Sequence, residues 1–257
     1  MRRIMRTTRI EEIREYIYKH KAVTLDNLCE VFQVSKNTIR RDIDELLEDP
    51  NIKKIYGGVT VEEVKSFISF DKRNISNLDL KQLIAKKAAD LVEENDIIFI
   101  DSGTTTFHMI EYIKNTKNLT ILTNSIEVIM RSIPYSNINV ISLSGVLNRE
   151  TLSFTGIGSA EVLSKYNLSK AFLAATGISI IGGATNSFPS ETEIKQAALQ
   201  KSQKNYILAD HTKFNEVSLM TFSNLENIDS IITDKLPGQE LSEHLIKNKC
   251  GIIIADK

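Results

Sequence analysis

Residues 35–41 place three side chains that can hydrogen-bond to DNA bases on one face of a predicted helix. These are Asn37, Thr38 and Arg41, and a rotation of about 100° per residue turns them away from an apolar stripe. The stripe consists of Ile39, Ile43, Leu46 and Leu47. Asn can bridge adenine, Arg can bridge guanine or contact phosphate, and Thr can contact a thymine methyl group. The pattern fits a helix that reads the major groove, and it fits an ordinary amphipathic helix with solvated charges equally well.

Two short helices joined by a tight turn, within Val23–Leu47, are predicted to position these side chains. Thr24 can cap the first helix, and Ser35 can cap the second, because a hydroxyl can accept a hydrogen bond from an amide of the first turn. The apolar face of the first helix consists of Leu25, Leu28, Cys29 and Phe32. A preceding helix that can complete a three-helix core is marked by Ile10, Ile13, Tyr16 and Ile17.

A β-prone run broken by two glycines follows the second helix. The run is Ile52–Thr60 with Gly57 and Gly58 inside it, and this pattern predicts a short hairpin. A hairpin in this place is a wing, and it would hold Lys53 and Lys54 near the phosphate backbone.

With this wing, the segment resembles the winged helix-turn-helix of the DeoR family of bacterial transcription regulators. The residues that carry the resemblance are Ser35, Thr38, Ile39, Arg40, Arg41, Asp42, Leu46, Gly57 and Gly58. The family usually has His before the paired glycines and Ala after them, where this chain has Tyr56 and Val59. We therefore expect a DNA-binding domain over residues 1–60. Its predicted contacts to double-stranded DNA are Ser35, Lys36, Asn37, Thr38, Arg40, Arg41, Lys53 and Lys54.

The charge of the chain is only mildly biased. The net charge of −1 divides into +2 for residues 1–60 and −3 for the remaining residues. DNA binding would therefore depend on local placement of cations and on a homo-oligomer, either a dimer or a tetramer, rather than on bulk charge. An N-terminal basic patch, which is either solvated or in contact with phosphates, consists of Arg2, Arg3, Arg6 and Arg9.

The composition argues against several other classes of protein. No apolar run is long enough to span a bilayer, and no secretory apolar region follows the basic start, so we expect a cytoplasmic protein. Cys29 and Cys250 are isolated and the four histidines are scattered, which indicates no metal site. The chain has neither a GxGxxG motif nor a nucleotide-binding P-loop, and we expect no cofactor.

Beyond the wing, short apolar runs alternate with helical patterns. The runs are Asp96–Ile100, Leu119–Leu122, Ile138–Leu143, Lys170–Ala175, Tyr206–Ala209, Ile228–Ile232 and Gly251–Ile254. Helices are predicted near Thr106–Lys114, Ile126–Ser132 and Glu191–Gln203. The alternation predicts an α/β domain over residues 79–257, with a mainly parallel sheet covered on both faces, after a connector at residues 61–78. Ligands of such folds bind beyond the carboxyl ends of the strands.

Polar residues follow five of these predicted strands. Asp101–Thr106 comes directly after the first, where Gly103 permits close backbone approach and the hydroxyls and amides can hold an anion or simply cap the helix. The other polar strand ends are Thr123–Ser125, Ser144–Gly145, Ala175–Ile178 and Ala209–Lys213. Glu191 and Lys195 lie one helical turn apart near the same edge, where they could also form an ordinary surface ion pair.

These pieces resemble the sensor domain of the DeoR family, which is similar in fold to ribose-5-phosphate isomerase. The matching residues are Asp101–Thr105, Thr123–Ser125, Gly145, Gly177, Ile178, Glu191, Glu193, Lys195, Ala209, Asp210, Lys213, Thr233 and Asp234. Arg73 and Lys81 stand where the family often has basic residues, whereas Ser144 and His211 depart from the usual small residues. The candidate effector-binding residues are Asp101, Ser102, Gly103, Thr104, Thr105, Thr106, Asn124, Ser125, Gly145, Gly177, Glu191, Lys195, Asp210 and Lys213.

The resemblance implies a transcription regulator, most often a repressor of a sugar-metabolism operon, that responds to a phosphorylated sugar. Ser102, Thr104, Thr105 and Lys213 would hold its anionic group, and Asp101 and Asp210 its hydroxyls. One alternative is a sugar-phosphate isomerase or transferase with Asp101, Asp210 or Glu191 as general base. Nothing in the sequence identifies an acid–base pair for such an enzyme, and an enzyme would leave the winged domain unexplained. A second alternative, a domain that only oligomerises, would not need the polar strand ends.

Overall fold

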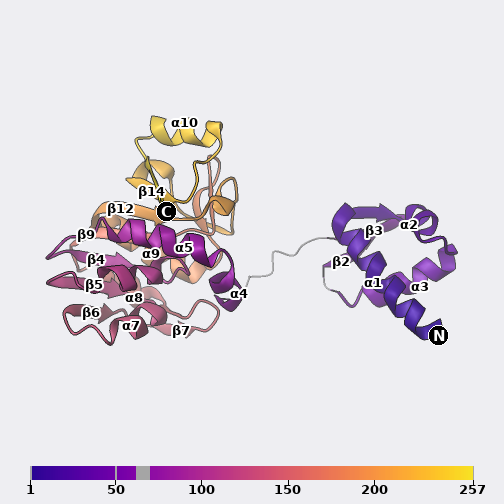
Figure 1. Ribbon diagram of the computed structural model, residues 1–257, viewed down its shortest axis with the longest axis horizontal. Coiled ribbons are helices and arrows are strands. Elements are labelled where there is room, and N and C mark those ends of the chain that lie inside the picture. Colours follow the sequence, from indigo (N-terminus) through magenta and orange to yellow (C-terminus); the bar gives the residue numbers. More distant parts are fainter. Residues whose placement is uncertain (1, 50, 62–69, 257) are drawn as a thin grey trace. The chain divides into compact units, whose positions relative to one another are not determined.

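The computed structural model describes residues 2–49, 51–61 and 70–256. The chain folds into two compact units, Met1–Phe67 and Ile68–Lys257, which are drawn in Figure 1. The predicted connector at residues 61–78 lies partly outside the described residues, at 62–69. Its described part contains the end of one strand, the short helix α4 (Phe70–Ile75) and the first residue of α5 (Leu78–Ala89).

The described residues of the first unit form three helices and a three-stranded antiparallel sheet of order β1-β3-β2. The elements are α1 (Arg2–His20), β1 (Ala22–Thr24), α2 (Leu25–Phe32), α3 (Lys36–Leu46), β2 (Ile52–Ile55) and β3 (Gly58–Val61). This arrangement confirms the predicted helices and wing, and it adds β1, which pairs with the wing and was not predicted. Core side chains that are at most 1% exposed are Ile13, Ile17, Leu28, Ile39, Ile43, Leu46 and Val59.

Both predicted helix caps of the first unit are present. The Thr24 hydroxyl accepts a hydrogen bond from the Asn27 amide at 3.1 Å, and the Ser35 hydroxyl accepts one from the Thr38 amide at 3.3 Å. Each cap satisfies an amide that has no partner inside its helix. Leu47 follows the end of α3 and is half-buried.

The second unit is built on a seven-stranded parallel sheet of order β15-β14-β12-β9-β4-β5-β6. The strands are β4 (Ile97–Ile100), β5 (Leu119–Thr123), β6 (Ile138–Ser142), β9 (Leu168–Ala174), β12 (Ser202–Leu208), β14 (Ser230–Thr233) and β15 (Gly251–Ile254). Every neighbouring pair runs parallel. The predicted fold class and all seven apolar runs are therefore confirmed.

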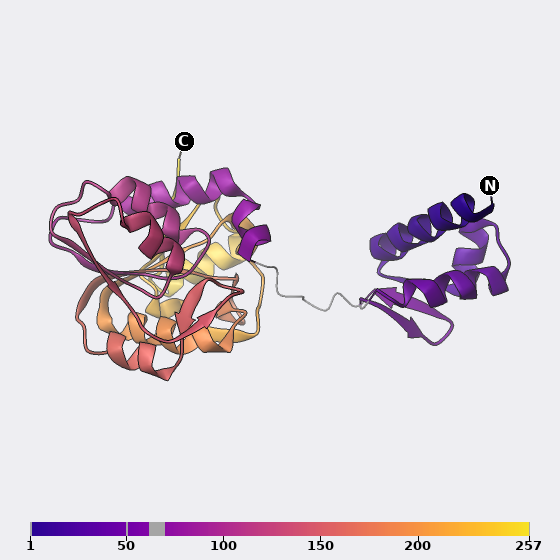
Figure 2. The same ribbon diagram turned by 90° about the horizontal axis from the view of Figure 1, so that it is seen from below.

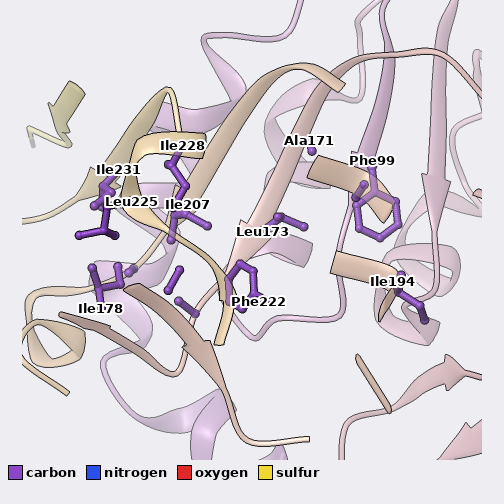
Figure 3. Packing of buried hydrophobic residues seen from close by; sticks show 14 of the residues in the cluster. Phe99, Ala171, Leu173, Ile178, Ile194, Ile207, Phe222, Leu225, Ile228 and Ile231 are labelled. Carbon is purple, nitrogen blue, oxygen red and sulfur yellow. The ribbon is translucent and has the colours of Figure 1, made fainter. Parts of the chain in front are cut away.

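Helices cover both faces of this sheet, as Figures 1 and 2 show. They are α5 with η1 (Thr106–Met109), α6 (Ile110–Ile113) and α7 (Ile126–Ser132) on one face, and α8 (Ile157–Leu163), α9 (Pro189–Lys201) and α10 (Gln239–Lys247) on the other. Successive strand residues alternate between the two cores: Phe99 and Leu173 pack on the second face, which Figure 3 shows, whereas Ile98 and Phe172 pack on the first.

Smaller elements lie outside the parallel sheet. One antiparallel sheet has the order β10-β11-β13, and β7 pairs with β8 in a hairpin. The bounds are β7 (Val146–Asn148), β8 (Ser153–Thr155), β10 (Gly177–Ser179), β11 (Gly183–Asn186), η2 (His211–Lys213), β13 (Met220–Ser223) and η3 (Leu225–Asn227). None of these strands was predicted, and Gly177, which we assigned to a loop, begins β10.

The helix predicted over Glu191–Gln203 ends earlier than expected, at Lys201. Ser202 already pairs with Leu168 in the parallel sheet, and its hydroxyl donates a hydrogen bond to the Ala198 carbonyl at 2.8 Å. Strand pairing thus overrides the helical pattern at these two positions. The helix predicted over Thr106–Lys114 is a 3₁₀ turn followed by one α-helical turn.

Candidate functional site

Helix α3 presents the predicted base-reading side chains on its exposed face. Asn37, Arg40 and Arg41 are exposed and Thr38 is half-buried, whereas Ile39 and Ile43 on the opposite face are buried in the core. Ser35 caps the helix, so its hydroxyl serves the fold in the free protein. The structure therefore leaves the polar face of α3 accessible to a partner.

Two lysines of the predicted DNA surface are paired with carboxylates. Lys36 lies 2.6 Å from Asp26, and Lys54 of the wing lies 2.6 Å from Asp44 of α3. The second pair borders a groove of about 270 Å³ between α3 and the wing, which Arg40 also lines. Both pairs are exposed, so phosphate oxygens can compete with these carboxylates at a small free-energy cost.

Arg9 of the N-terminal basic patch has a structural partner. Its guanidinium donates two hydrogen bonds to the buried Asp42 carboxylate, at 2.9 and 3.1 Å, and thereby joins α1 to α3. The hydrogen bond to Asp42 raises the pKa of Arg9 above its ordinary value. The side chains of Arg2, Arg3 and Arg6 lie outside the described part of the chain.

The second unit contains a cavity of about 110 Å³ at the carboxyl edge of its parallel sheet. The loop after β4, the ends of β9 and β12, the start of α9 and the helices α4 and α5 all contribute to its wall. Predicted residues that line it are Ser102, Gly103, Thr104, Thr105, Glu191, Lys195, Asp210 and Lys213. The structure therefore brings together eight of the candidates from three separate stretches of sequence.

Among the residues that the structure describes, four cationic side chains line this cavity. They are Arg73, Lys81, Lys195 and Lys213. Burial is the main reason that the pKa of Lys81 falls to about 8, and the Asp210 carboxylate opposes this change. Burial also lowers the pKa of Arg73, although the Glu191 and Asp101 carboxylates oppose this. The site thus concentrates positive charge where solvation is poor, which favours an anionic ligand.

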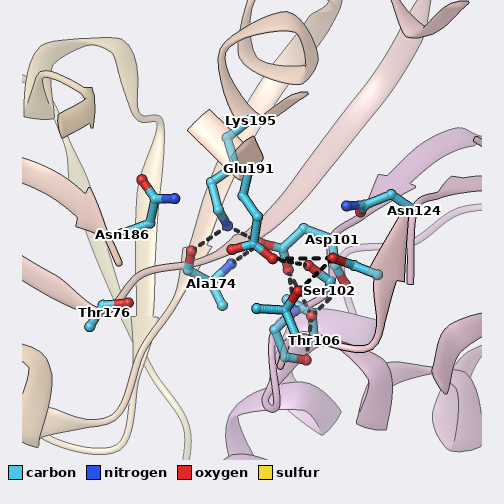
Figure 4. Close-up of polar contacts among 12 residues, drawn as sticks. Asp101, Ser102, Thr106, Asn124, Ala174, Thr176, Asn186, Glu191 and Lys195 are labelled. Atoms are coloured by element: carbon cyan, nitrogen blue, oxygen red, sulfur yellow. Dashed lines mark hydrogen bonds and ion pairs between the residues drawn. The ribbon is translucent and has the colours of Figure 1, made fainter. Parts of the chain in front are cut away.

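Asp101 and Lys195 form a buried ion pair behind the cavity, shown in Figure 4. One Asp101 oxygen accepts hydrogen bonds from the Gly103 amide at 3.0 Å and the Thr106 hydroxyl at 2.8 Å. The other oxygen accepts one from the Ala174 amide at 2.9 Å in addition to the Lys195 ammonium. Asp101 therefore shapes the loop after β4. Because both of its carboxylate oxygens already accept hydrogen bonds within the protein, the structure argues against the predicted contact of Asp101 with a sugar hydroxyl.

Glu191 is a second buried carboxylate at the cavity wall. Its Oε1 accepts hydrogen bonds from the hydroxyls of Ser102 at 2.9 Å and Ser153 at 3.4 Å. Figure 4 shows Glu191 beside Lys195 and above the loop that carries Ser102. Ser153 belongs to the β7–β8 hairpin, so that hairpin helps to orient a carboxylate that can accept hydrogen bonds from ligand hydroxyls.

The loop after β4 keeps donors available at the cavity. Thr104 and Thr105 are 7% and 5% exposed, and both line the cavity. Neither their hydroxyls nor their backbone amides bond to another residue within the described ranges. The Lys213 ammonium likewise has no hydrogen-bond or ion-pair partner among the residues described. Amides, hydroxyls and an ammonium group are the donors that bind phosphate.

The remaining six effector candidates do not line the cavity. Asp101 and Thr106 support the loop from behind, and the Ser125 hydroxyl caps α7. The Asn124 amide donates to the Phe154 carbonyl at 3.3 Å. Gly145 and Gly177 allow close backbone packing, because an added Cβ would lie 2.4 Å from the Thr155 oxygen and 2.3 Å from the Glu216 oxygen respectively.

The structure also places residues at the cavity that our candidate list omitted. They are Arg73, Ser76, Lys81, Thr176 and Asn186. The resemblance had marked Arg73 and Lys81, but no strand end pointed to them. Asn186 ends β11 and accepts a hydrogen bond from the Thr192 hydroxyl of α9 at 3.0 Å. No sequence signal identified β11, so its position at the cavity was not predictable.

Two features are absent from the described residues. No group of three or more His, Cys, Asp or Glu side chains in the described ranges is arranged to hold a metal ion. Within the same ranges, no helix is long and apolar enough to cross a membrane.

Solved structures with a similar fold have low sequence identity. Ribose 5-phosphate isomerase A from Methanocaldococcus jannaschii is 20% identical, with a TM-score of 0.41, over 54% of this chain and 55% of that chain. The eIF2B beta subunit from Chaetomium thermophilum is 12% identical, with a TM-score of 0.47, over 83% of this chain and 57% of that chain.

Comparison with known sequences is more specific. Residues 9–65 match the family model of the DeoR-like helix-turn-helix domain, and residues 76–235 match that of the DeoR C-terminal sensor domain. The HTH-type transcriptional regulator IolR of Bacillus subtilis is 41% identical over 98% of this chain and 100% of the relative. The repressor GlcR of the same species is 29% identical over 97% and 96%.

A third relative, the lactose phosphotransferase system repressor of Staphylococcus epidermidis, is 31% identical over 88% of this chain and 91% of its own length. Two of these relatives are transcriptional regulators by name, and the third is named a repressor. The predicted family is therefore confirmed, as is the prediction of a regulator rather than an enzyme. The chain belongs to the DeoR family of HTH-type transcriptional regulators, with a DNA-binding helix-turn-helix domain followed by a sensor domain.

Proposed function

We propose that this regulator represses a sugar-metabolism operon and that a phosphorylated sugar in the cavity of the second unit changes its affinity for DNA. The observation that carries the proposal is the cavity itself. It combines unbonded donors of Thr104 and Thr105 with the cations Arg73, Lys81 and Lys213. The names of the related repressors, one for a lactose phosphotransferase system, support a sugar-linked role.

The residues that line the cavity suit both parts of a phosphosugar. The phosphate would accept hydrogen bonds from the amides and hydroxyls of Thr104 and Thr105, and its charge would be balanced by Lys81 and Lys213. Sugar hydroxyls would donate to Glu191 and bond to the Asn186 amide. Asp210 accepts hydrogen bonds from Asn77 and Thr212 and would orient the Lys213 turn.

On the DNA, α3 would occupy the major groove. Asn37, Thr38 and Arg41 would contact bases, and Lys36, Arg40 and the wing lysines would contact phosphates. One such domain provides few base contacts, so we propose a symmetric homo-oligomer that presents two or more of them. A ligand that shifts DNA affinity must bind the two states unequally, and a coupling of about 1–3 kcal/mol is typical.

The test uses DNA selected from a random pool by the full-length protein. Fluorescence anisotropy would measure DNA affinity with a panel of phosphosugars and with the matching free sugars, while product formation is followed in the same samples. We expect one phosphosugar to change DNA affinity without turnover. Lys213→Ala should weaken that phosphosugar far more than the free sugar. Equal losses for both, or turnover of the phosphosugar, would contradict the proposal.

A further inference from the structure

Helix α4 is both part of the cavity wall and the first described element after residues 62–69. Those residues connect it along the chain to the DNA-binding unit. Arg73 of α4 and Ser76 just beyond it line the cavity, and Lys81 of α5 lines it beside them. A change in α4 would therefore affect the described element of the sensor domain that is nearest, along the chain, to the DNA-binding unit.

Helix α4 is too short to be stable without tertiary contacts. It contains six residues, and isolated helices shorter than about 12 residues are marginal in water. Its position must be set by side chains that join it to the rest of the second unit. The described contacts of this kind fall into two groups, one apolar and one polar, and both lead to the cavity.

The apolar contact runs through Phe70. This side chain is 5% exposed, and its ring centroid lies 6.2 Å from that of Phe107. Phe107 belongs to η1, which begins at Thr106 and directly continues the loop of Thr104 and Thr105. An anion that orders this loop would therefore also fix the surface on which α4 packs.

The polar contacts involve the cavity cations. The Lys81 ammonium donates a hydrogen bond to the Arg73 carbonyl, one of the last carbonyls of α4, and the Arg73 guanidinium donates to the Glu150 carbonyl at 3.2 Å. Just after α4, the Asn77 amide donates to the Asp210 carboxylate at 3.3 Å. An anion would interact directly with the two cations that hold this helix.

We infer that α4 is the element through which an anion in the cavity acts on the DNA-binding unit. This inference rests on the proposed function and adds a physical route to it. The anion bonds to the loop of Thr104 and Thr105 and to the cations Arg73 and Lys81, and so favours the docked state of α4. The free protein would populate an undocked α4 more often.

The first experiment measures hydrogen exchange of the full-length protein with inorganic phosphate as the probe. Sodium chloride at equal ionic strength is the control for salt effects. We expect phosphate to slow exchange at least threefold in two segments, the loop 102–106 and residues 70–77, which contain α4. Protection of the loop without protection of the helix would overturn the inference alone. Protection of neither segment would overturn the proposed anion site as well.

The second experiment separates ligand binding from coupling. Phe70→Ala removes the apolar contact of α4 without touching the cavity, and Ile75→Ala is the matched control because Ile75 is 74% exposed on the same helix. We expect calorimetry to show weaker phosphate binding in Phe70→Ala, because binding must then also dock α4, and an affinity within threefold of the wild type in Ile75→Ala. The effect of phosphate on DNA affinity should disappear in Phe70→Ala and persist in Ile75→Ala.

A second variant guards against misfolding of Phe70→Ala. Asn77 has a left-handed backbone with φ of 54°, so Asn77→Gly keeps that conformation while it removes the hydrogen bond to Asp210. We expect that phosphate changes the DNA affinity of this variant less than that of the wild type, as in Phe70→Ala. If Phe70→Ala and Asn77→Gly are both folded and phosphate changes their DNA affinity as much as that of the wild type, then α4 does not transmit the signal.

Discussion

Lys195 illustrates how a candidate ligand-binding residue can serve the fold at the same time. Its ammonium pairs with the buried Asp101 carboxylate and donates to the Ala174 carbonyl at 2.8 Å. Through Asp101, this contact sets the position of the Gly103 amide and hence of the loop that carries the free donors. The pair is thus part of the structure that shapes the cavity.

Replacing Lys195 should therefore destabilise the second unit. Lys195→Met leaves the Asp101 charge buried without its cation, and we expect a loss of about 3–5 kcal/mol in unfolding free energy. Urea unfolding followed by circular dichroism would measure it. The control is Lys204→Met, which breaks the exposed pair with Asp229 and should leave the unfolding free energy nearly unchanged. Similar small losses for both variants would contradict this role of the buried pair.

Lys81 should make anion binding depend on pH. With a pKa of about 8, lowered mainly by burial, its ammonium is charged below that pH and neutral above it. Affinity for a sugar phosphate ester should therefore be retained at pH 7 and fall by up to about tenfold per pH unit above 8. The second ionisation of phosphate esters, near pH 6, is complete in this range.

The matched variant for this prediction is Lys81→Arg, because a guanidinium stays charged throughout the range. Calorimetric titrations between pH 7 and 9 should show an affinity that falls with rising pH for the wild type and stays constant for this variant. A wild-type affinity that does not change across pH 8 would remove Lys81 from the anion site.

At the scale of elements, α3 concentrates the expected base recognition. Arg41 is exposed on the face opposite Ile39 and Ile43. If it makes a bidentate base contact, Arg41→Ala should cost about 1–3 kcal/mol in binding to the selected DNA. Anisotropy titrations would measure this, with Arg149→Ala in the second unit as the control. Unchanged affinity in Arg41→Ala would place Arg41 outside the reading face.

Binding of the wing to DNA should depend on competition between the Asp44 carboxylate and DNA phosphates for the Lys54 ammonium. Asp44 of α3 holds Lys54 at 2.6 Å in the free protein. Asp44→Asn removes that competitor, so we expect DNA affinity to rise about two- to fivefold for all sequences, as exposed pairs contribute little. The control is Asp79→Asn, because Asp79 is exposed on α5. A weaker complex in Asp44→Asn would instead mean that the pair positions the wing for binding.

The way in which an element is buried determines whether it could be predicted from the sequence. The seven strands of the parallel sheet are covered on both faces, so they read as continuous apolar runs such as Ile97–Ile100. The strands Gly177–Ser179 and Gly183–Asn186 contain Gly, Ser, Thr and Asn and show no such run. The strand β11 also pairs with β13, which is distant in sequence, and no local pattern reveals that pairing.

The same limit applies to the cavity. Polar strand ends such as Ser102 and Lys213 were predictable because a parallel sheet gathers its carboxyl ends at one edge. Arg73 and Ser76 come from a segment before the first strand of the sheet, and only the folded structure brings them to that edge. Asp101 has the residue type of a ligand contact, yet burial and four protein donors make it a structural group.

At the scale of the whole molecule, a symmetric oligomer should leave its mark on the DNA. Selected sequences should contain an inverted repeat whose half-sites are separated by about one or more helical turns of roughly 10 base pairs. Deleting one half-site should weaken binding by more than about tenfold, since a single winged domain makes few contacts. Gel-shift titrations with whole and half operators would measure this. Equal affinity for both would indicate that one DNA-binding unit suffices.

The order of the parallel sheet explains why a crevice exists in the second unit at all. From β4 the chain proceeds outward through β5 to β6, and then returns to add β9 on the other side of β4. The segments that leave β4 and β9 consequently diverge, and the gap between them follows from chain winding rather than from any particular side chain. Relatives with this winding could exchange residues such as Thr176 or Asn186 and accept a different metabolite without rebuilding the scaffold.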